Sequence, residues 1–430
     1  MGIYAKILQD SITGIYRTNA ANKILQFINR IRNESDVNQA RRFLIELMQN
    51  ARDLAYKNPH GTPEPVSICI RLSDTELEFS HNGKVFSAKD ILSIIYQVSS
   101  KKPGEGIGQF GTGFMSTYQL SERVELTSYL KNDDNPYLPF TVCLDRSGLN
   151  KEEILDAIER AMAQLMAADQ AEGIPDEEFD LTGYNTSFLY HLDQERSREI
   201  ARIGMEDLDH TILYTLLFSP QIRAVELIYE TDFRRERIIY TNGTPVELGN
   251  GLYSMEFLQG DRTRHLVYQS AGEGAERITV ACEYSDGQIL PIGEQTPKLY
   301  IDFPLIGAEQ FPFPTVINCR ALCPNEPRSG ISLVDNPHSH DALRNKELMK
   351  QAVVLYGQFL HNLVEQDFGS LQNAVAMPVC PENKEWSAQW VRARLYNGCL
   401  GCMKREPIFP TRIGKRSLAE GKLCLIRERN

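Results

Sequence analysis

The sequence predicts an α+β protein with two or more domains, and three observations support this fold class. The chain has 430 residues, about three times the usual length of a single domain. Up to about residue 205, segments with helical spacing of apolar residues alternate with short strand-like segments. Further on, several strand-like segments precede one long amphipathic helix. We therefore expect a first domain over residues 1–205, a second over 206–366 and a C-terminal extension over 367–430.

Two helices should open the first domain. Apolar residues at helical spacing predict a helix over residues 19–33, and Ser35 is the expected N-cap of a second helix that runs to about Tyr56. Two further helices are predicted over residues 88–99 and 151–168. Alternating or continuous apolar runs predict strands over residues 66–72, 76–80, 124–130, 139–144 and 186–191.

The second domain should be a mixed one, with a sheet and one long helix. Short strands are predicted over residues 226–229, 237–240, 265–269, 278–282 and 299–303. The helix is expected over residues 342–365, where Leu348, Leu355 and Phe359 recur at helical spacing and would pack on that sheet. The last 65 or so residues show little pattern.

The charge balance disfavours extended binding to nucleic acid. Lys and Arg number 46 against 57 Asp and Glu, which gives a net charge of −11, the wrong sign for a protein devoted to phosphate backbones. Local basic patches remain at Arg234, Arg235 and Arg237 and in residues 412–429, and such patches are usually solvated faces.

The chain carries no evident secretory or membrane signal. Its first ten residues lack a basic region followed by an apolar run, and no uncharged apolar stretch reaches the roughly 18 residues of a membrane helix. Nine cysteines scattered through a long chain are typical of free thiols in a reducing compartment, so we expect a cytoplasmic protein. Cys399 and Cys402 form one C-x-x-C pair, with Cys380 and Cys424 on either side, which leaves a zinc site open.

Three polar residues share one stripe of the second predicted helix. Glu46, Asn50 and Asp53 stand at positions i, i+4 and i+7. Two carboxylates and an amide in a row can position a water and bind a hard cation through oxygen. An isolated stripe of this kind is usually only a solvated helix face.

Two further motifs follow along the chain. Residues 79–84 (FSHNGK) form a polar turn after a strand, which by itself is a common hairpin turn. Residues 104–113 contain five glycines and precede an apolar helical continuation. Backbone N–H groups at such a helix start favour a phosphate chain, whereas the bland interpretation is a flexible loop. The stretch is neither a Walker nor a Rossmann motif, because no Gly-Lys-Ser or Gly-Lys-Thr closes it and a helix and a polar turn precede it.

Taken in order, the three motifs resemble the N box and the two glycine boxes of the superfamily of gyrase, heat-shock chaperone, histidine kinase and MutL (GHKL) ATPases. Residues 107–116 (IGQFGTGFMS) are especially similar to the box of the ninety-kilodalton heat-shock chaperones, and the His-Asn-Gly followed by Phe86 is similar to the sacsin-type branch. The similarity covers residues 35–130. It implies a Bergerat-type α/β sandwich that binds ATP, followed by a domain resembling the chaperone middle domain.

The resemblance also implies roles for single residues. Glu46 would be the general base for the attacking water, Asn50 the Mg²⁺ ligand and Asp53 a residue of the nucleotide pocket. The other implied ATP-binding positions are His81, Asn82, Gly83, Ser99, Ser100, Lys101, Gly108, Gln109, Phe110, Gly111, Thr112, Gly113, Phe114 and Thr186. Lys101 would neutralise a phosphate, with Lys102 as its competitor.

An arginine of the second domain would reach the γ-phosphate. Arg328, in a loop before the long helix, is the expected residue, and Arg320 and Arg344 are its rivals. The bland interpretation of each is a surface salt bridge.

The sequence departs from the superfamily at the base-binding position. His81 stands where the superfamily has an aspartate that accepts from the adenine amino group, and Val85 replaces the second glycine of that box. A neutral imidazole has one acceptor nitrogen where a carboxylate has several lone pairs, so we expect only a small preference for ATP.

The expected function is magnesium-dependent ATP hydrolysis in a chaperone-like cycle of lid closure and domain docking, with a client protein or partner subunit. The family also implies a homodimer. The alternative is a nucleotide-gated sensor or scaffold module that hydrolyses little. A histidine kinase would need a phosphoacceptor helix that residues 1–35 are too short to supply, and work on DNA conflicts with the acidic charge.

Overall fold

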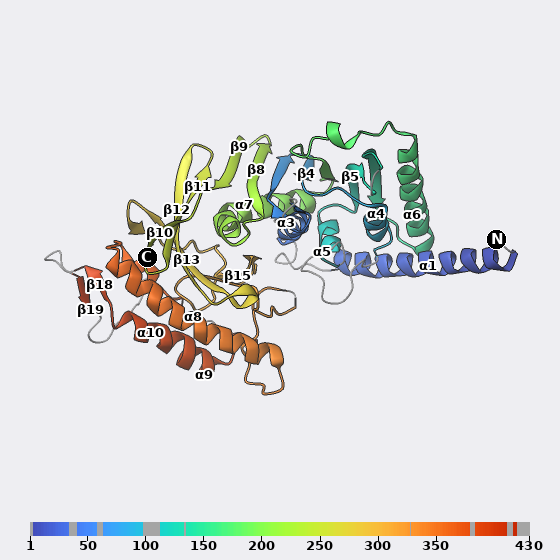
Figure 1. Cartoon of the computed structure of the whole chain (residues 1–430). Helices are drawn as coiled ribbons and strands as arrows, with labels where there is room; N and C mark the ends of the chain where they lie inside the picture. The colour runs from blue at the N-terminus through green and yellow to red at the C-terminus, as the bar shows by residue number, and fades with distance from the viewer. Residues whose placement is uncertain are drawn as a thin grey trace. The chain divides into compact units, whose positions relative to one another are not determined.

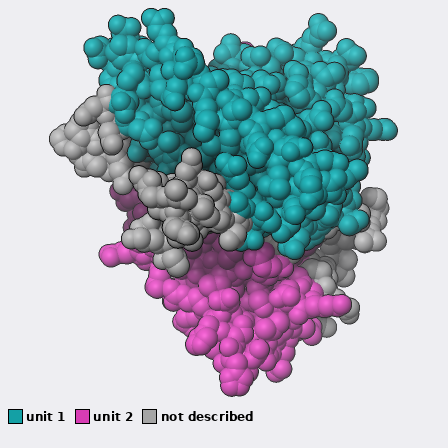
Figure 2. Space-filling view, turned by 90° about the vertical axis from the view of Figure 1, so that its right-hand side faces the viewer, with its two compact units in different colours: residues 1–207, 220–239 teal, residues 208–219, 240–430 magenta. Residues whose placement is uncertain are grey.

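The computed structural model describes residues 3–33, 41–57, 63–97, 112–132, 135–326, 328–378, 383–410 and 416–418. The chain divides into two compact units, coloured separately in Figure 2. Unit 1 comprises residues 1–207 and 220–239, and unit 2 comprises residues 208–219 and 240–430. Both combine helices with strands in a mixed α/β arrangement, compatible with the predicted α+β class.

Among the described residues, the main strands of unit 1 are hydrogen-bonded in the order β8-β3-β4-β7-β5-β6. The strands are β3 (Val66–Ser73), β4 (Glu76–His81), β5 (Arg123–Leu130), β6 (Leu138–Asp145), β7 (Thr186–His191) and β8 (Ile222–Glu230). All neighbours pair antiparallel except β3 and β8, which run parallel. Strand β5 alternates between buried and exposed residues, so one face of the sheet is covered and the other is more open. A separate small pairing joins β1 (Tyr56–Lys57) to β2 (Pro63–Glu64).

The described helices of unit 1 are α1, α3, α4, α5, α6 and the first part of α7 (Figure 1). Their bounds are α1 (Ile3–Asn33), α3 (Phe43–Asp53), α4 (Ala88–Ile95), α5 (Thr112–Met115), α6 (Lys151–Met166) and α7 (Glu195–Phe218). Ser87 and Asp90 form a reciprocal capping box that starts α4, and the Asn150 side chain caps α6. Short 3-10 turns are η1 (Ser116–Gln119), η2 (Ala167–Gln170) and η3 (Asp176–Glu178).

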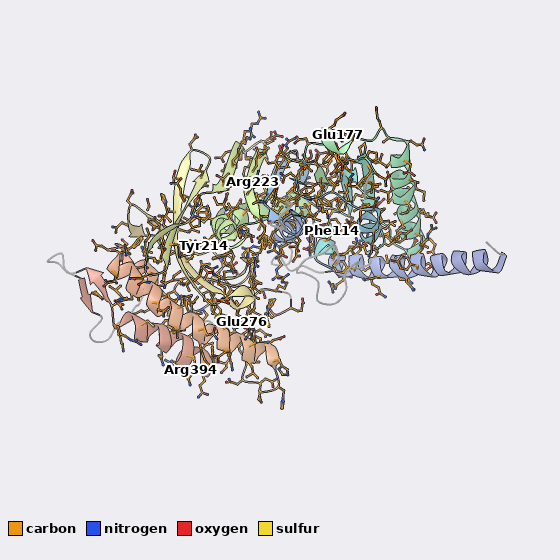
Figure 3. The ribbon with its side chains drawn as sticks, viewed as in Figure 1. Phe114, Glu177, Tyr214, Arg223, Glu276 and Arg394 are labelled. Atoms are coloured by element: carbon orange, nitrogen blue, oxygen red, sulfur yellow. The ribbon has the colours of Figure 1, made fainter. Side chains whose placement is uncertain are left out.

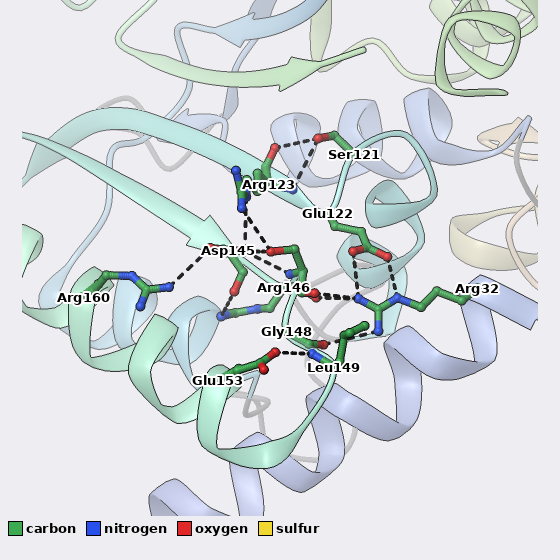
Figure 4. A network of polar contacts seen from close by, with 11 residues as sticks. Arg32, Ser121, Glu122, Arg123, Asp145, Arg146, Gly148, Leu149, Glu153 and Arg160 are labelled. Atoms are coloured by element: carbon green, nitrogen blue, oxygen red, sulfur yellow. Dashed lines mark hydrogen bonds and ion pairs between the residues drawn. The ribbon is translucent and has the colours of Figure 1, made fainter. Parts of the chain in front are cut away.

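A polar network ties α1 to the ends of β5 and β6 (Figure 4). The Arg32 guanidinium makes two bonds of 2.7 and 2.8 Å with the Glu122 carboxylate and a third, of 3.0 Å, with the Ser147 carbonyl. Asp145 accepts from the backbone N–H of Ser147 and pairs with Arg160. Paired guanidinium–carboxylate bonds fix orientation as well as distance, so the C-terminal end of α1 is held against this part of the sheet.

The described strands of unit 2 are hydrogen-bonded in the order β9-β11-β12-β13-β17-β15-β16, and they pair antiparallel except for β15 and β17, which run parallel. Strand β10 pairs with β11, and β14 pairs with β13. The strands are β9 (Arg235–Asn242, part of it in unit 1), β10 (Val246–Gly249), β11 (Leu252–Gln259), β12 (Arg262–Ala271), β13 (Ile278–Ser285), β14 (Gln288–Ile289), β15 (Leu299–Ile301), β16 (Phe303–Pro304) and β17 (Val316–Cys319).

A long helix, α8 (His340–Glu365), packs its apolar stripe against β12 and β13 to form the core of unit 2. Turns η4 (Gly274–Glu276) and η5 (Leu371–Ala374) lie within this unit. The C-terminal part contributes α9 (Ala388–Trp390), the π-helical turn η6 (Val391–Tyr396), α10 (Asn397–Met403) and the hairpin of β18 (Pro407–Pro410) and β19 (Arg416–Leu418). Val391, Leu395 and Cys399 join the same core.

Most predicted elements are present, with different ends. Helix α3 ends at Asp53, short of the predicted Tyr56, and Ser35 lies outside the described residues. The single strand predicted over residues 299–303 is wrong, because Asp302 takes a left-handed conformation (φ 61°) and separates β15 from β16. None of the helices in the described ranges combines the length and apolarity that a membrane crossing requires.

We expect Gly204→Ala to destabilise unit 1, because α7 approaches α3 closely there. A Cβ at Gly204 would lie 2.6 Å from the Phe43 ring, which is fully buried at the start of α3. Such overpacking costs about 1–3 kcal/mol. The matched control is Gly14→Ala, also in a helix, where a Cβ meets nothing within 4 Å and should change stability by at most about 1 kcal/mol in the favourable direction. Thermal unfolding of both variants checks this, and equal melting temperatures would contradict it.

Candidate functional site

The turn after β4 is joined to the end of α3. The backbone N–H of Lys84 donates to the Leu54 carbonyl over 2.6 Å, directly after the last residue of α3. A Cβ at Gly83 would lie 3.1 Å from His81 Nδ1 and 3.2 Å from both Leu54 Cβ and its carbonyl oxygen. Glycine therefore lets the polar turn and the C-terminus of α3 approach each other this closely.

A row of polar side chains crosses the covered face of the sheet. His81 at the end of β4 lies directly opposite Thr186 at the start of β7, and the Thr186 hydroxyl is 2.8 Å from that of Ser128 on β5. All three side chains are buried. The neighbours on this face are apolar, among them Phe79 and Phe188. Three hydrogen-bonding groups in such a setting are unusual, because burying a polar group costs free energy unless it is paired.

His81 is held as a neutral imidazole. Its side chain is 1 % exposed, and this burial lowers its pKa to about 4. The backbone N–H of Gly83 donates to His81 Nδ1 over 3.1 Å. Because a neutral imidazole carries a single proton, that proton resides on Nε2.

The lowered pKa of His81 predicts a loss of stability in acid. Unfolded His81 takes up a proton near pH 6.5, whereas folded His81 does so only near pH 4, so the unfolded state binds more protons between these values and stability falls as the pH drops through them. The full loss is about 3 kcal/mol at roughly 1.36 kcal/mol per pKa unit. His81→Gln should flatten the profile, while His191→Gln on the surface should not. Denaturant unfolding from pH 7 to pH 4 tests this, and parallel profiles for wild type and His81→Gln would contradict it.

The polar stripe of α3 lies on a largely buried helix. Asn50 is 6 % exposed, and its Nδ2 has no hydrogen-bond partner among the described residues. Glu46 lies one turn earlier and is half-buried. Asp53 pairs with the Arg52 guanidinium at 2.9 Å.

These residues fit a magnesium ion that also binds phosphate, and they do not form a metal cage by themselves. Within the described ranges, no group of three or more His, Cys, Asp or Glu side chains could hold a metal. Mg²⁺ is commonly bound through one or two protein oxygens with the remaining ligands from phosphate and water. The Asn50 carboxamide oxygen suits that arrangement.

The end of the second glycine box packs on the same face. Helix α5 begins at Thr112 and contacts α3. Phe114, labelled in Figure 3, is fully buried with its ring 5.5 Å from that of Phe188. The backbone of Thr112 and Gly113 is helical. The predicted positions Ser99, Ser100, Lys101, Gly108, Gln109, Phe110 and Gly111, and the rival Lys102, lie outside the described residues.

Asn82 supports the sheet. Its side-chain oxygen accepts from the backbone N–H of Ser67 over 2.7 Å, and its own N–H donates to the Ser67 carbonyl. The carboxamide therefore closes the ladder between β3 and β4 and sets where the turn at Gly83 begins.

Sequence reasoning missed three side chains near these motifs. Ser128 could have been found, because it follows Val124 and Leu126 at the buried positions of β5. Arg146, fully buried, donates from Nη2 to the carbonyl of Ile95 at the end of α4 over 2.8 Å. Lys23 on α1 donates to the Gln97 carbonyl over 3.2 Å. The two cations donate to carbonyls at the last residue of α4 and just past it, which the sequence of α4 alone does not reveal.

In unit 2, Arg328 lies in a closely packed loop. The Asn325 side chain accepts from the backbone N–H groups of Ser329 and Gly330, and Arg328 takes a left-handed conformation with φ 55°. The loop packs closely against Gly307, because a Cβ added at Gly307 would lie 2.9 Å from Ser329 Cβ. A non-glycine residue in this conformation persists only where its surroundings fix it.

The three candidate arginines differ in their partners. Arg320 pairs with the buried Asp302 carboxylate at 2.6 Å. Arg344 pairs with Glu276, which is labelled in Figure 3. No carboxylate of the described residues forms an ion pair with Arg328. Of the three, Arg328 has its guanidinium uncommitted within the part of the chain that the structure describes.

The C-x-x-C pair lies on α10. Cys399 is buried in the core of unit 2, where burial raises the pKa of its thiol, and Cys402 Sγ donates to the Val353 carbonyl. Cys380 and Cys424 lie outside the described residues, so the zinc site stays a prediction.

Comparison of the chain with protein-family models found no match, and comparison with curated proteins found none either.

Proposed function

We propose that unit 1 is a nucleotide-binding domain of the Bergerat type and that the protein hydrolyses ATP with Mg²⁺. The observation that carries this proposal is the convergence of motifs that lie far apart in the sequence. The end of α3 bonds to the turn at Gly83, His81 pairs with Thr186, and α5 packs on α3. The superfamily resemblance implies this same set of elements for its ATP site.

The described side chains divide into two groups by their chemistry. Glu46 and Asn50, on adjacent turns of α3, would supply an acid–base group and an oxygen ligand for Mg²⁺ at the phosphate end of the nucleotide. His81 and Thr186 are hydrogen-bonding groups on an apolar floor, which suits a flat base. An apolar floor with a few fixed polar groups binds a base through stacking area and orients it through hydrogen bonds.

In the proposed reaction, Glu46 accepts the proton of a water whose oxygen attacks the γ-phosphorus, and the bond from the γ-phosphorus to the bridging oxygen of ADP breaks. Asn50 would hold Mg²⁺ through its carboxamide oxygen. A bound Mg²⁺ neutralises charge on the phosphate oxygens. Little covalent chemistry is asked of the protein, so the fixed positions of Glu46 and Asn50 on one buried helix are what matter.

We assign the γ-phosphate contact to Arg328. Its loop is closely packed, so the backbone is fixed in advance, while its guanidinium has no ion pair among the described residues. An arginine that must bind a transferred phosphate should not be neutralised beforehand by a carboxylate, as Arg320 and Arg344 are. The proposed cycle is chaperone-like and cytoplasmic, with a client protein or a second copy of the chain as partner.

Nucleotide binding tests the proposal. Titration calorimetry of the full chain with ATP, in Mg²⁺ and in EDTA, should show binding that Mg²⁺ strengthens. Asn50→Ala should remove the strengthening, since the metal loses its protein ligand, while Asn33→Ala at the exposed end of α1 should keep it. Absence of binding by folded wild-type protein would show that the proposal is wrong.

A further inference from the structure

No described residue accepts a hydrogen bond from the His81 side chain, which is 1 % exposed. Its Nδ1 already accepts from Gly83, so Nε2 bears the proton, and no described residue accepts a hydrogen bond from it. The side chain is almost completely buried between the rings of Phe79 and Phe188, with centroids 6.3 and 6.5 Å away. A ligand that presents an acceptor to Nε2–H would give this donor the hydrogen bond that the described residues do not supply.

The neighbouring hydroxyl groups of Thr186 and Ser128 can bond to either a donor or an acceptor on a ligand. Thr186 and Ser128 share one hydrogen bond of 2.8 Å, in which either oxygen can be the donor. A hydroxyl both donates and accepts, so this pair can bind a ring N–H or an unprotonated ring nitrogen. The imidazole has no such freedom, because the Gly83 N–H fixes its tautomer. Of the three side chains, His81 is therefore the one that determines whether a ligand must present a hydrogen-bond acceptor or a donor at this position.

We infer that His81 reads the base through its Nε2–H, so that the site takes purine nucleotides with a carbonyl at position six, such as inosine and guanine nucleotides, at least as well as ATP. The inference rests on the proposed nucleotide site and names its substrate class. It goes beyond the small ATP preference expected from the sequence.

The chemistry follows from the edges of the bases. A 6-oxopurine presents an acceptor at position six and a donor at N1, which match an imidazole N–H and a hydroxyl oxygen. Adenine presents an amino group at position six, and two N–H groups facing each other repel. A carboxylate at this position, as in the superfamily, has the opposite preference, because it accepts from the amino group and repels a carbonyl oxygen.

ATP and ITP form the sharpest pair of probes, because they share ribose and triphosphate and differ only at the six-position edge. We expect titration calorimetry of the full chain with Mg²⁺ to give a Kd for ITP no higher than that for ATP. His81→Asp should shift the ratio of the two Kd values toward ATP by at least about tenfold. His191→Asp, on the surface, should leave the ratio unchanged.

The outcomes separate the two proposals. Tighter binding of ATP than of ITP by the wild-type protein would overturn the inference that His81 reads the base, and the proposal of a nucleotide site would be unaffected. Binding of neither nucleotide would overturn both. Because His81→Asp could misfold, a second test uses the wild-type protein with ¹⁵N-labelled histidine. Its NMR spectrum should show the His81 ring protonated on Nε2. The Nδ1–H form would overturn the inference without any variant.

Discussion

Glu46→Gln should reduce phosphate release from ATP by at least about 100-fold, the lower end of what a general base contributes. The amide keeps the size of the side chain but cannot take the proton of the attacking water. Nucleotide binding should change little, because Glu46 acts on the water and not on the base. A coupled phosphate assay measures the first quantity and titration calorimetry the second.

The control is Glu177→Gln, an exposed residue of η3 labelled in Figure 3, which should release phosphate at the wild-type rate. Loss of release together with loss of binding in Glu46→Gln would mean a misfolded site. Unchanged release in the folded variant would remove Glu46 as the base.

Arg328→Ala should lower turnover by at least about 100-fold while ATP affinity stays within about threefold of wild type. An arginine that stabilises the charge developing on a transferred phosphate raises kcat by about 10³–10⁵-fold. The expected loss of about 100-fold is smaller because the contribution is reduced in a partly exposed site. The loop should keep its shape, since Asn325 and the contact at Gly307 hold its backbone. Steady-state kinetics with ATP measure both quantities.

Arg344→Ala is the matched control, because Arg344 forms an exposed pair with Glu276 and its loss should cost little. Arg320→Ala is less suitable, since it leaves the buried Asp302 carboxylate without its partner and should destabilise unit 2. Unchanged turnover in Arg328→Ala, with turnover lost in Glu46→Gln, would show that the arginine assignment is wrong.

The elements that carry the motifs could be predicted because their patterns are local. The α3 stripe and the β3–β4 hairpin follow from residue spacing and from the turn at Ser73. The register that sets His81 opposite Thr186 joins residues more than 100 positions apart, and no local pattern encodes it.

Helix α7 was not predicted from the sequence, although Ala201, Met205, Leu208 and Ile212 recur on it at helical spacing. Its first part belongs to unit 1 and its second part to unit 2, and its buried residues include polar ones such as Thr211 and Thr215. The break at Asp302 depends on a left-handed residue stabilised by Asn318 and Arg320 from other strands and loops. Such features come from packing, which a single sequence does not show.

The ion pairs of the three arginines could not be predicted from the sequence either. Arg320, Arg328 and Arg344 look alike in the sequence, and only the positions of Asp302 and Glu276 distinguish them. The tautomer of His81 similarly depends on one backbone N–H, that of Gly83.

Phosphate release from ATP by the full chain, in Mg²⁺ and in EDTA and alongside nucleotide binding, is the measurement to make first. We expect slow release in Mg²⁺, none in EDTA, and binding in both. Binding without release would contradict ATP hydrolysis and favour a nucleotide-gated module, and no binding at all would contradict the nucleotide site itself.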